Sequence, residues 1–186
     1  MKNFLCLVLA ATIHYSLFTI HCLYAAAKIE SISGEVTVND ASAIVGQQLN
    51  TNDVIKTSAV SNSVIIINGH AVTVSEKTEA SISELTEESS LFKIWLGKIR
   101  AKVNKLKAKQ KFEVKTPTAI VAVRGTDFAV DVSADLLTRL EVYEGVVSAK
   151  EETTGGEVLV NPGEFTTIQK GEAPKEPEKI EKETEK

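Results

Sequence analysis

The sequence contains little of what most catalytic and metal sites are made from. Of its 186 residues, two are cysteine and three are histidine. Both cysteines, Cys6 and Cys22, lie in an N-terminal segment that we expect to be removed. The remaining chain would hold one histidine, His70, which excludes disulfides, cysteine–histidine nucleophilic chemistry and a histidine-based metal cluster. No Gly-rich phosphate loop or nucleophile elbow is present, so we expect neither an enzyme nor a cofactor.

Aromatic residues are also scarce, at 5% of the chain, whereas apolar residues make up 43%. A core must therefore be filled by valine, isoleucine and leucine, of which the β-branched types favour strands. The net charge of −4 is too small to assign a partner. We do not expect the protein to bind nucleic acid, because the basic residues are not interleaved with aromatic residues that could stack on bases.

Residues 1–27 have the pattern of a secretory signal peptide. Lys2 supplies the positive charge, residues 4–23 are mostly apolar, and Ala25, Ala26 and Ala27 form a small-residue cleavage site. We expect cleavage near Ala27 and a periplasmic or secreted bacterial protein with no transmembrane span. The alternative is an uncleaved anchor, because about 20 apolar residues suffice to cross a bilayer.

Short apolar stretches separated by turn residues predict one all-β domain over residues 28–169. Asn68 and Gly69, between two apolar runs, are the strongest hairpin signal, and His70 beside them is expected in solvent. We expect about a dozen short strands in a two-sheet sandwich or a short β-roll. Residues 91–106 fit either a helix or a strand, and the strand-like neighbours favour a strand.

Residues 170–186 differ from the rest of the chain, because they are almost all lysine, glutamate and proline with one large apolar residue, Ile180. Such a segment buries too little apolar surface to offset its chain entropy, so a disordered tail is predicted.

Three glycines recur in a similar context along the predicted domain. Gly34, Gly97 and Gly145 are each followed by small or branched apolar residues two and four positions later. Their spacing is unequal, which indicates a recurring local device at the start of strands and not a solenoid of fixed period.

The most informative stretch is residues 115–128. Pro117 marks a turn, residues 119–123 form a short apolar run typical of a buried strand, and Phe128 begins an alternating strand. Gly125 between them indicates a bulge or a close backbone approach. Arg124 has the parity of Phe128, so it is expected to point inward as a structural staple, with ligand contact as the alternative, and Glu144 is its expected partner.

These residues resemble the signature of the FecR protein domain. The shared positions are Thr116, Pro117, Thr118 and Ala119, then Val123, Arg124, Gly125, Thr126 and Phe128, with Glu144 and Gly145 in a later segment that resembles the end of the domain. The resemblance extends from about residue 32 to residue 169. It implies a β domain without enzymatic activity, in a family named for membrane-spanning regulators that relay iron-siderophore signals to sigma factors.

A basic run offers a second candidate surface. The members that we single out for anion binding are Lys98, Arg100, Lys102, Lys105 and Lys107. Such a run can bind an anionic polymer, although exposed lysines also protect the edge of a sheet from aggregation.

From the sequence we therefore favour a non-enzymatic, exported FecR-like module that binds an unidentified envelope protein or polysaccharide. Two alternatives stay open: regulation of an extracytoplasmic sigma-factor pathway, and binding of an anionic envelope polysaccharide through the basic run. The namesakes carry a cytoplasmic domain ahead of their apolar segment, and no such domain precedes residue 4 here, which makes sigma-factor regulation the less expected role.

Overall fold

The computed structural model describes residues 26–181, which form seventeen β-strands and contain no helix. The all-β expectation is confirmed, and residues 91–106 lie largely within one strand, β9 (Ser89–Lys102). The predicted signal peptide, apart from Ala26 and Ala27, and the last five residues lie outside the described residues. Ala27 is buried and begins the first strand that the structure describes.

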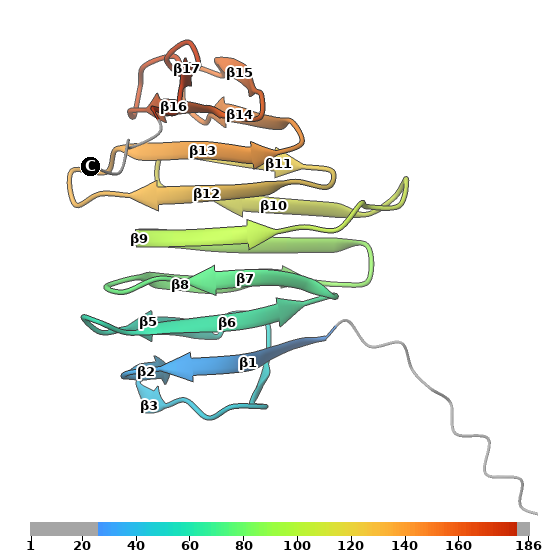
Figure 1. The fold of residues 1–186 in the computed structure, drawn as a ribbon, viewed down its shortest axis with the longest axis vertical. Coiled ribbons are helices and arrows are strands. Elements are labelled where there is room, and N and C mark those ends of the chain that lie inside the picture. The colour runs from blue at the N-terminus through green and yellow to red at the C-terminus, as the bar shows by residue number, and fades with distance from the viewer. Residues whose placement is uncertain (1–25, 182–186) are drawn as a thin grey trace, which may run out of the picture.

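Two sheets, A and B, share β9 and lie face to face (Figure 1). Sheet A has the order β4, β1, β6, β7, β9, β12, β13, β16, β17 and contains β1 (Ala27–Ser33), β4 (Gln48–Leu49), β6 (Asn62–Ile67), β7 (His70–Val74), β12 (Asp127–Val132), β13 (Thr138–Glu144), β16 (Glu164–Ile168) and β17 (Glu178–Lys179). Sheet B has the order β3, β2, β5, β8, β9, β10, β11, β14, β15 and contains β2 (Val36–Val38), β3 (Ala41–Ser42), β5 (Val54–Thr57), β8 (Glu79–Leu85), β10 (Lys111–Lys115), β11 (Ala119–Val123), β14 (Val147–Glu151) and β15 (Glu157–Val160).

Strand β9 belongs to both sheets. Its first part pairs with β8 and β10 in sheet B, and from Gly97 onward it pairs with β7 and β12 in sheet A. The pairing of β9 with β10 is parallel, and the other pairings are antiparallel. Hairpins therefore alternate between the sheets, and Figure 1 shows the strands stacked along the long axis from the N-terminal to the C-terminal end.

The space between the sheets is filled mainly by aliphatic side chains, as the low aromatic content predicts. Only three phenylalanines, Phe92, Phe112 and Phe128, are fully buried there, and the rest of the core is valine, isoleucine, leucine and alanine. The inward residues alternate along strands such as β6 and β11, which is the pattern of a sheet with one buried face.

The three recurring glycines lie where the chain passes from one sheet to the other. Gly34 links β1 to β2, Gly97 lies within β9, and Gly145 links β13 to β14. All three have positive φ angles, and a Cβ atom at any of them would overlap a serine or threonine on a neighbouring crossover. At Gly97, for example, it would lie 2.6 Å from the Cα atom of Thr78. Each of these glycines therefore allows the chain to cross between the sheets in close contact with a neighbouring crossover.

The tail prediction is wrong for residues 170–181. This segment follows the edge of sheet A, where β17 pairs with β16 and the N–H of Lys175 donates to the carbonyl of Thr167 at 3.1 Å. The segment has few apolar side chains to bury, but its backbone forms hydrogen bonds with an open sheet edge, and such bonds need no apolar side chain.

The expectation for His70 is also wrong, although the hairpin turn at Asn68 and Gly69 is present. His70 is only 8% exposed, packs edge-to-face against Phe112, and accepts a hydrogen bond from the N–H of Asn104 at its Nδ1 atom. Burial lowers the pKa of His70. The loop after β9 covers this side chain, and such a long-range contact leaves no local sequence signal.

Glu151, at the end of β14, fastens the C-terminal segment to the domain. Its buried carboxylate accepts hydrogen bonds from the N–H groups of Thr153 and Thr154, from the Thr154 hydroxyl, and from the N–H of Gly171 at 3.1 Å. The backbone bond from Thr154 is the main cause that lowers the pKa of Glu151 to about 2, and the bond from Gly171 acts in the same direction. The charged form of Glu151 therefore holds both its own turn and the beginning of the C-terminal segment.

We expect Glu151→Gln to lower the melting temperature at pH 7 by several degrees, because the amide places an NH₂ group among backbone donors. A carboxyl whose pKa is depressed by folding stabilises the protein above its ordinary pKa of 4.5, and this contribution is lost as the pH falls toward 2. The difference from wild type should therefore shrink between pH 4.5 and pH 2 in thermal melts. Glu152→Gln, which removes a surface pair with Lys115, is the control and should change the melting temperature little.

Candidate functional site

The site is centred on residues 124–126, which carry the chain from β11 in sheet B to β12 in sheet A. The N–H of Thr126 donates to the carbonyl of Val103, and the N–H of Val103 donates to the carbonyl of Thr126. Gly125 has a φ of 133°, and a Cβ atom there would lie 3.0 Å from the Cα atom of Lys105. Gly125 thus lies where two backbone segments meet closely, a position suited to glycine.

Arg124 does not point into the core, so the expectation of an inward guanidinium is wrong. Its side chain is exposed, and the inward positions are Val123 before the crossover and Thr126 after it. The alternation shifts by one residue because the chain changes sheets here, and side-chain parity cannot be carried across such a change. Arg124 and Glu144 line the same groove, but no ion pair joins them in the described structure.

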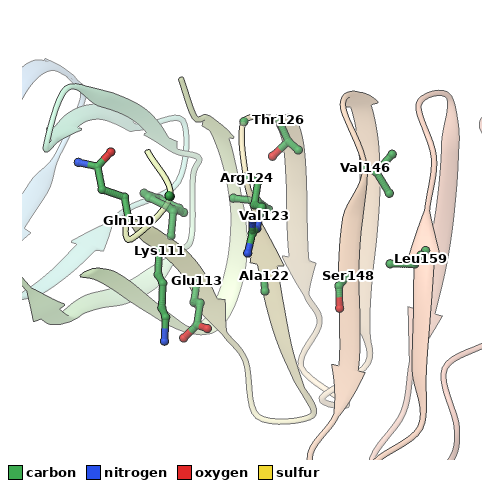
Figure 2. A pocket seen from close by; sticks show the side chains of 13 residues that line it. Gln110, Lys111, Glu113, Ala122, Val123, Arg124, Thr126, Val146, Ser148 and Leu159 are labelled. Carbon is green, nitrogen blue, oxygen red and sulfur yellow. The ribbon is translucent and has the colours of Figure 1, made fainter. Parts of the chain in front are cut away.

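A groove of about 560 Å³ lies on the outer face of sheet B beside this crossover (Figure 2). Its floor is one cross-strand row, in which Glu113 pairs with Ala122, Ala122 with Ser148, and Ser148 with Leu159. Adjacent strands are about 4.8 Å apart, so the row is about 14 Å long. The two central side chains are small, which leaves the floor low. We call this the apolar groove.

The walls of the apolar groove differ in character. Figure 2 shows Gln110 and Lys111 at one side, Arg124 in the middle, and Val146 and Leu159 at the other side. Val146 is 48% exposed and Leu159 is 60% exposed, which is high for branched aliphatic residues on a sheet. The sequence analysis missed both residues. For Leu159 a usable signal was present, because β15 carries apolar side chains on both faces.

A second hollow, of about 430 Å³, lies on the other side of the same crossover, and we call it the cationic groove. Lys102, Lys105 and Arg124 line it, together with Asp127 and Glu144. Asp127 is already bound, because both of its carboxylate oxygens accept hydrogen bonds from Arg100 at 2.8 and 2.9 Å. The three cations are exposed and form no ion pair with any residue between 26 and 181.

The basic run predicted from the sequence is therefore divided. Lys98 lies 3.8 Å from Glu141, and Arg100 is held by Asp127 and stacks on the ring of Tyr143, so both are engaged within the protein. Lys102 and Lys105 reach the cationic groove, whereas Lys107 lies exposed in the loop between β9 and β10. Arg124, which the sequence analysis did not group with the basic run, joins these two lysines from the crossover between β11 and β12.

Thr126 has a buried hydroxyl with no hydrogen-bond partner in the described structure. At the two equivalent crossings, the N–H after the glycine donates to such a hydroxyl: Glu35 to Ser61 at 2.9 Å, and Lys98 to Thr78 at 3.0 Å. At Gly145 it is the Cγ2 methyl group of Thr126 that faces the glycine, and the corresponding bond is absent. At the crossing formed by Gly145 and Thr126, the Thr126 hydroxyl is therefore left without a hydrogen bond, and Thr126 lines both grooves.

Comparison with known proteins identifies the domain. The family model described as FecR protein matches residues 53–148, which is more than half of the chain. The chain belongs to the FecR family. The FecR match contains both parts of the crossover, residues 103–106 and 124–126, and Gly145, and it ends at Ser148 in the floor of the apolar groove.

Solved structures share the fold of this FecR protein. Two crystal structures, at 2.50 and 1.65 Å resolution, of a protein from Parabacteroides distasonis ATCC 8503 provisionally described as an anti-sigma factor superpose with a TM-score of 0.57 and 21% identity. Each match covers 68% of this chain and 58% of the other, so the chain spans less than two thirds of that protein. No curated protein matches.

Two further observations concern the described part of the FecR chain. Between residues 26 and 181 no helix crosses a membrane, and no cluster of three metal-binding side chains occurs. The side chains that line the two grooves supply exposed cations, apolar groups and the free hydroxyl of Thr126.

The FecR motif residues Thr116, Pro117 and Thr118 lie at the turn between β10 and β11, away from the grooves. The hydroxyl of Thr116 accepts a hydrogen bond from the N–H of Ala119 at 2.9 Å. The Thr118 hydroxyl lies 2.7 Å from that of Thr138 on β13 and 3.3 Å from the carbonyl of Ile168 on β16. This buried network connects sheet B to sheet A, which gives the Thr-Pro-Thr sequence a structural role.

Two threonine-to-valine substitutions compare the stability contributed by a hydrogen-bonded hydroxyl, that of Thr118, with that of a hydroxyl without a partner, that of Thr126. Thr118→Val should lower the free energy of unfolding by about 1–3 kcal/mol, because Thr138 and Ile168 lose a buried partner. Thr126→Val should leave it within about 0.5 kcal/mol of wild type or raise it slightly, since no hydrogen bond is lost there. Urea denaturation measures both, and equal losses in the two variants would contradict the assignment.

Proposed function

We propose that this FecR-family chain is an exported, non-enzymatic binding module that regulates a sigma-factor signalling pathway from the bacterial envelope. The family match over residues 53–148 carries the proposal, and the shared fold with a protein described as an anti-sigma factor supports it. Of the roles considered from the sequence, the comparisons favour this regulatory role over a general scaffold.

The geometry of the site supports recognition of a partner in preference to catalysis. The two grooves are open and lined by aliphatic side chains and unpaired cations, and these groups bind surfaces without activating a nucleophile. The apolar groove lies in sheet B near its last strand, where a partner can reach it from outside.

Deletion of the gene from its native bacterium tests the proposal. Transcript profiling should then show a coherent change in promoters that depend on one alternative sigma factor, and the wild-type gene should restore the original profile. An unchanged transcript profile, under conditions in which the protein is produced, would refute sigma-factor regulation. A Gly97→Ala gene, which encodes a destabilised domain, should fail to restore the profile, whereas a Gly46→Ala gene should restore it.

A further inference from the structure

We propose that the apolar and cationic grooves form one docking site for an extended, acidic segment of the partner protein. This inference rests on the proposed regulatory function and names the chemistry of the partner. Arg124, Gly125 and Thr126 line both grooves, so the two hollows meet at the crossover between β11 and β12. A bound segment can therefore contact both at once.

The charges of the site select an acidic ligand. Six cations in the described residues form ion pairs: Lys28, Lys56, Lys98, Arg100, Lys115 and Arg139. Other lysines, such as Lys107 and Lys150, are exposed without an ion pair but line neither groove. Lys102, Lys105 and Arg124 lack such a partner, although they line one groove. With Asp127 held by Arg100, only the exposed Glu144 opposes these three positive charges. Carboxylates of a partner would complete the arrangement.

The free hydroxyl of Thr126 is an independent sign of a ligand. Its counterparts Ser61 and Thr78 accept backbone hydrogen bonds, whereas Thr126 is 4% exposed and has no partner. A buried polar group without a partner is costly and needs an explanation. A ligand group that enters at the crossover, where both grooves touch Thr126, would supply that bond.

The apolar groove indicates a peptide in preference to a polysaccharide. Val146 and Leu159 expose aliphatic side chains beside the low floor formed by Ala122 and Ser148. Sugars usually stack on exposed aromatic rings, but the only aromatic residue that lines either groove is Phe112, which is 1% exposed. An aliphatic side chain of a peptide fits the apolar groove, and an adjacent carboxylate then reaches Arg124.

Fluorescence anisotropy with labelled hexapeptides tests this site on the full-length protein. The probe alternates leucine and glutamate, and matched peptides replace glutamate with glutamine or lysine. We expect the acidic peptide to bind at least tenfold more tightly than either control at low salt, and to weaken as the salt concentration rises. Absence of binding, or equal binding of all three peptides, would overturn the proposal.

Variants locate the binding. Arg124→Glu and Lys105→Glu should each weaken binding of the acidic peptide at least tenfold, and Thr126→Val should weaken it by a few-fold without loss of stability. Lys150→Glu is the matched control, because it reverses an exposed lysine on the same sheet outside both grooves and should leave affinity unchanged. Unchanged affinity in Arg124→Glu and Lys105→Glu, with wild-type melting curves, would overturn the site.

Two further measurements separate this site from its rivals. Polygalacturonate that binds while the acidic peptide does not would assign the grooves to an anionic polysaccharide and overturn the peptide proposal. In the deletion strain, restoration of the transcript profile by an Arg124→Glu, Lys105→Glu double variant would refute the docking site while leaving the regulatory function intact. Failure of the double variant to restore it, with normal protein levels, supports both.

Discussion

Gly97→Ala should destabilise the domain by about 2–5 kcal/mol, a large part of the stability of a typical domain. A Cβ atom at residue 97 would lie 2.6 Å from the Cα atom of Thr78 and 2.7 Å from the carbonyl oxygen of Lys77. Both atoms belong to the backbone, so the crossover would have to shift, at a cost of about 1–3 kcal/mol for overpacking. The positive φ adds about 1–2 kcal/mol for a residue with a side chain.

Gly46→Ala is the matched control for this effect. Gly46 has a φ of 83°, close to the 88° of Gly97, but a Cβ atom there would meet no heavy atom within 4 Å. Only the backbone strain remains, so we expect a loss of about 1–2 kcal/mol. Thermal and urea unfolding measure both variants, and similar losses at the two positions would show that the packing at Thr78 is not tight.

Phe128→Ala should lower the free energy of unfolding by about 3–5 kcal/mol, because it leaves a cavity in the centre of the core. Phe128 is fully buried on β12, next to β9 and β13 in sheet A. Phe165→Ala removes the same atoms from a half-buried ring that stacks with Arg139, so its cost should stay below about 2 kcal/mol. Equal costs in urea denaturation would place Phe128 outside the core.

Much of the fold is readable from the sequence because its signals are local. Asn68 and Gly69 predict a hairpin that is present, and the alternation that begins at Phe128 predicts the buried side chains of Phe128, Val130 and Val132. The recurrence of Gly34, Gly97 and Gly145 also marks real positions. What the pattern cannot show is that these glycines lie where the chain changes sheets, since that depends on residues far away such as Thr78.

The candidate site was harder to predict for the same reason. The parity of Arg124 points inward only if one strand continues through it, and the change from sheet B to sheet A breaks that condition. The cationic groove joins Lys102 and Lys105 to Arg124 through backbone contacts between two segments about 20 residues apart. Leu159 and Val146 become neighbours of that site only after β14 and β15 are in place.

The position of strand β9 determines how the domain is expected to unfold. It is the only strand in the described residues that hydrogen-bonds within both sheets, and the hairpins before and after it are connected through it. Neither half of the stack can therefore loosen from the other while β9 keeps its ladders. We therefore expect the amide hydrogens of β9 to exchange only through global unfolding, and the two halves of the stack to unfold in one cooperative transition.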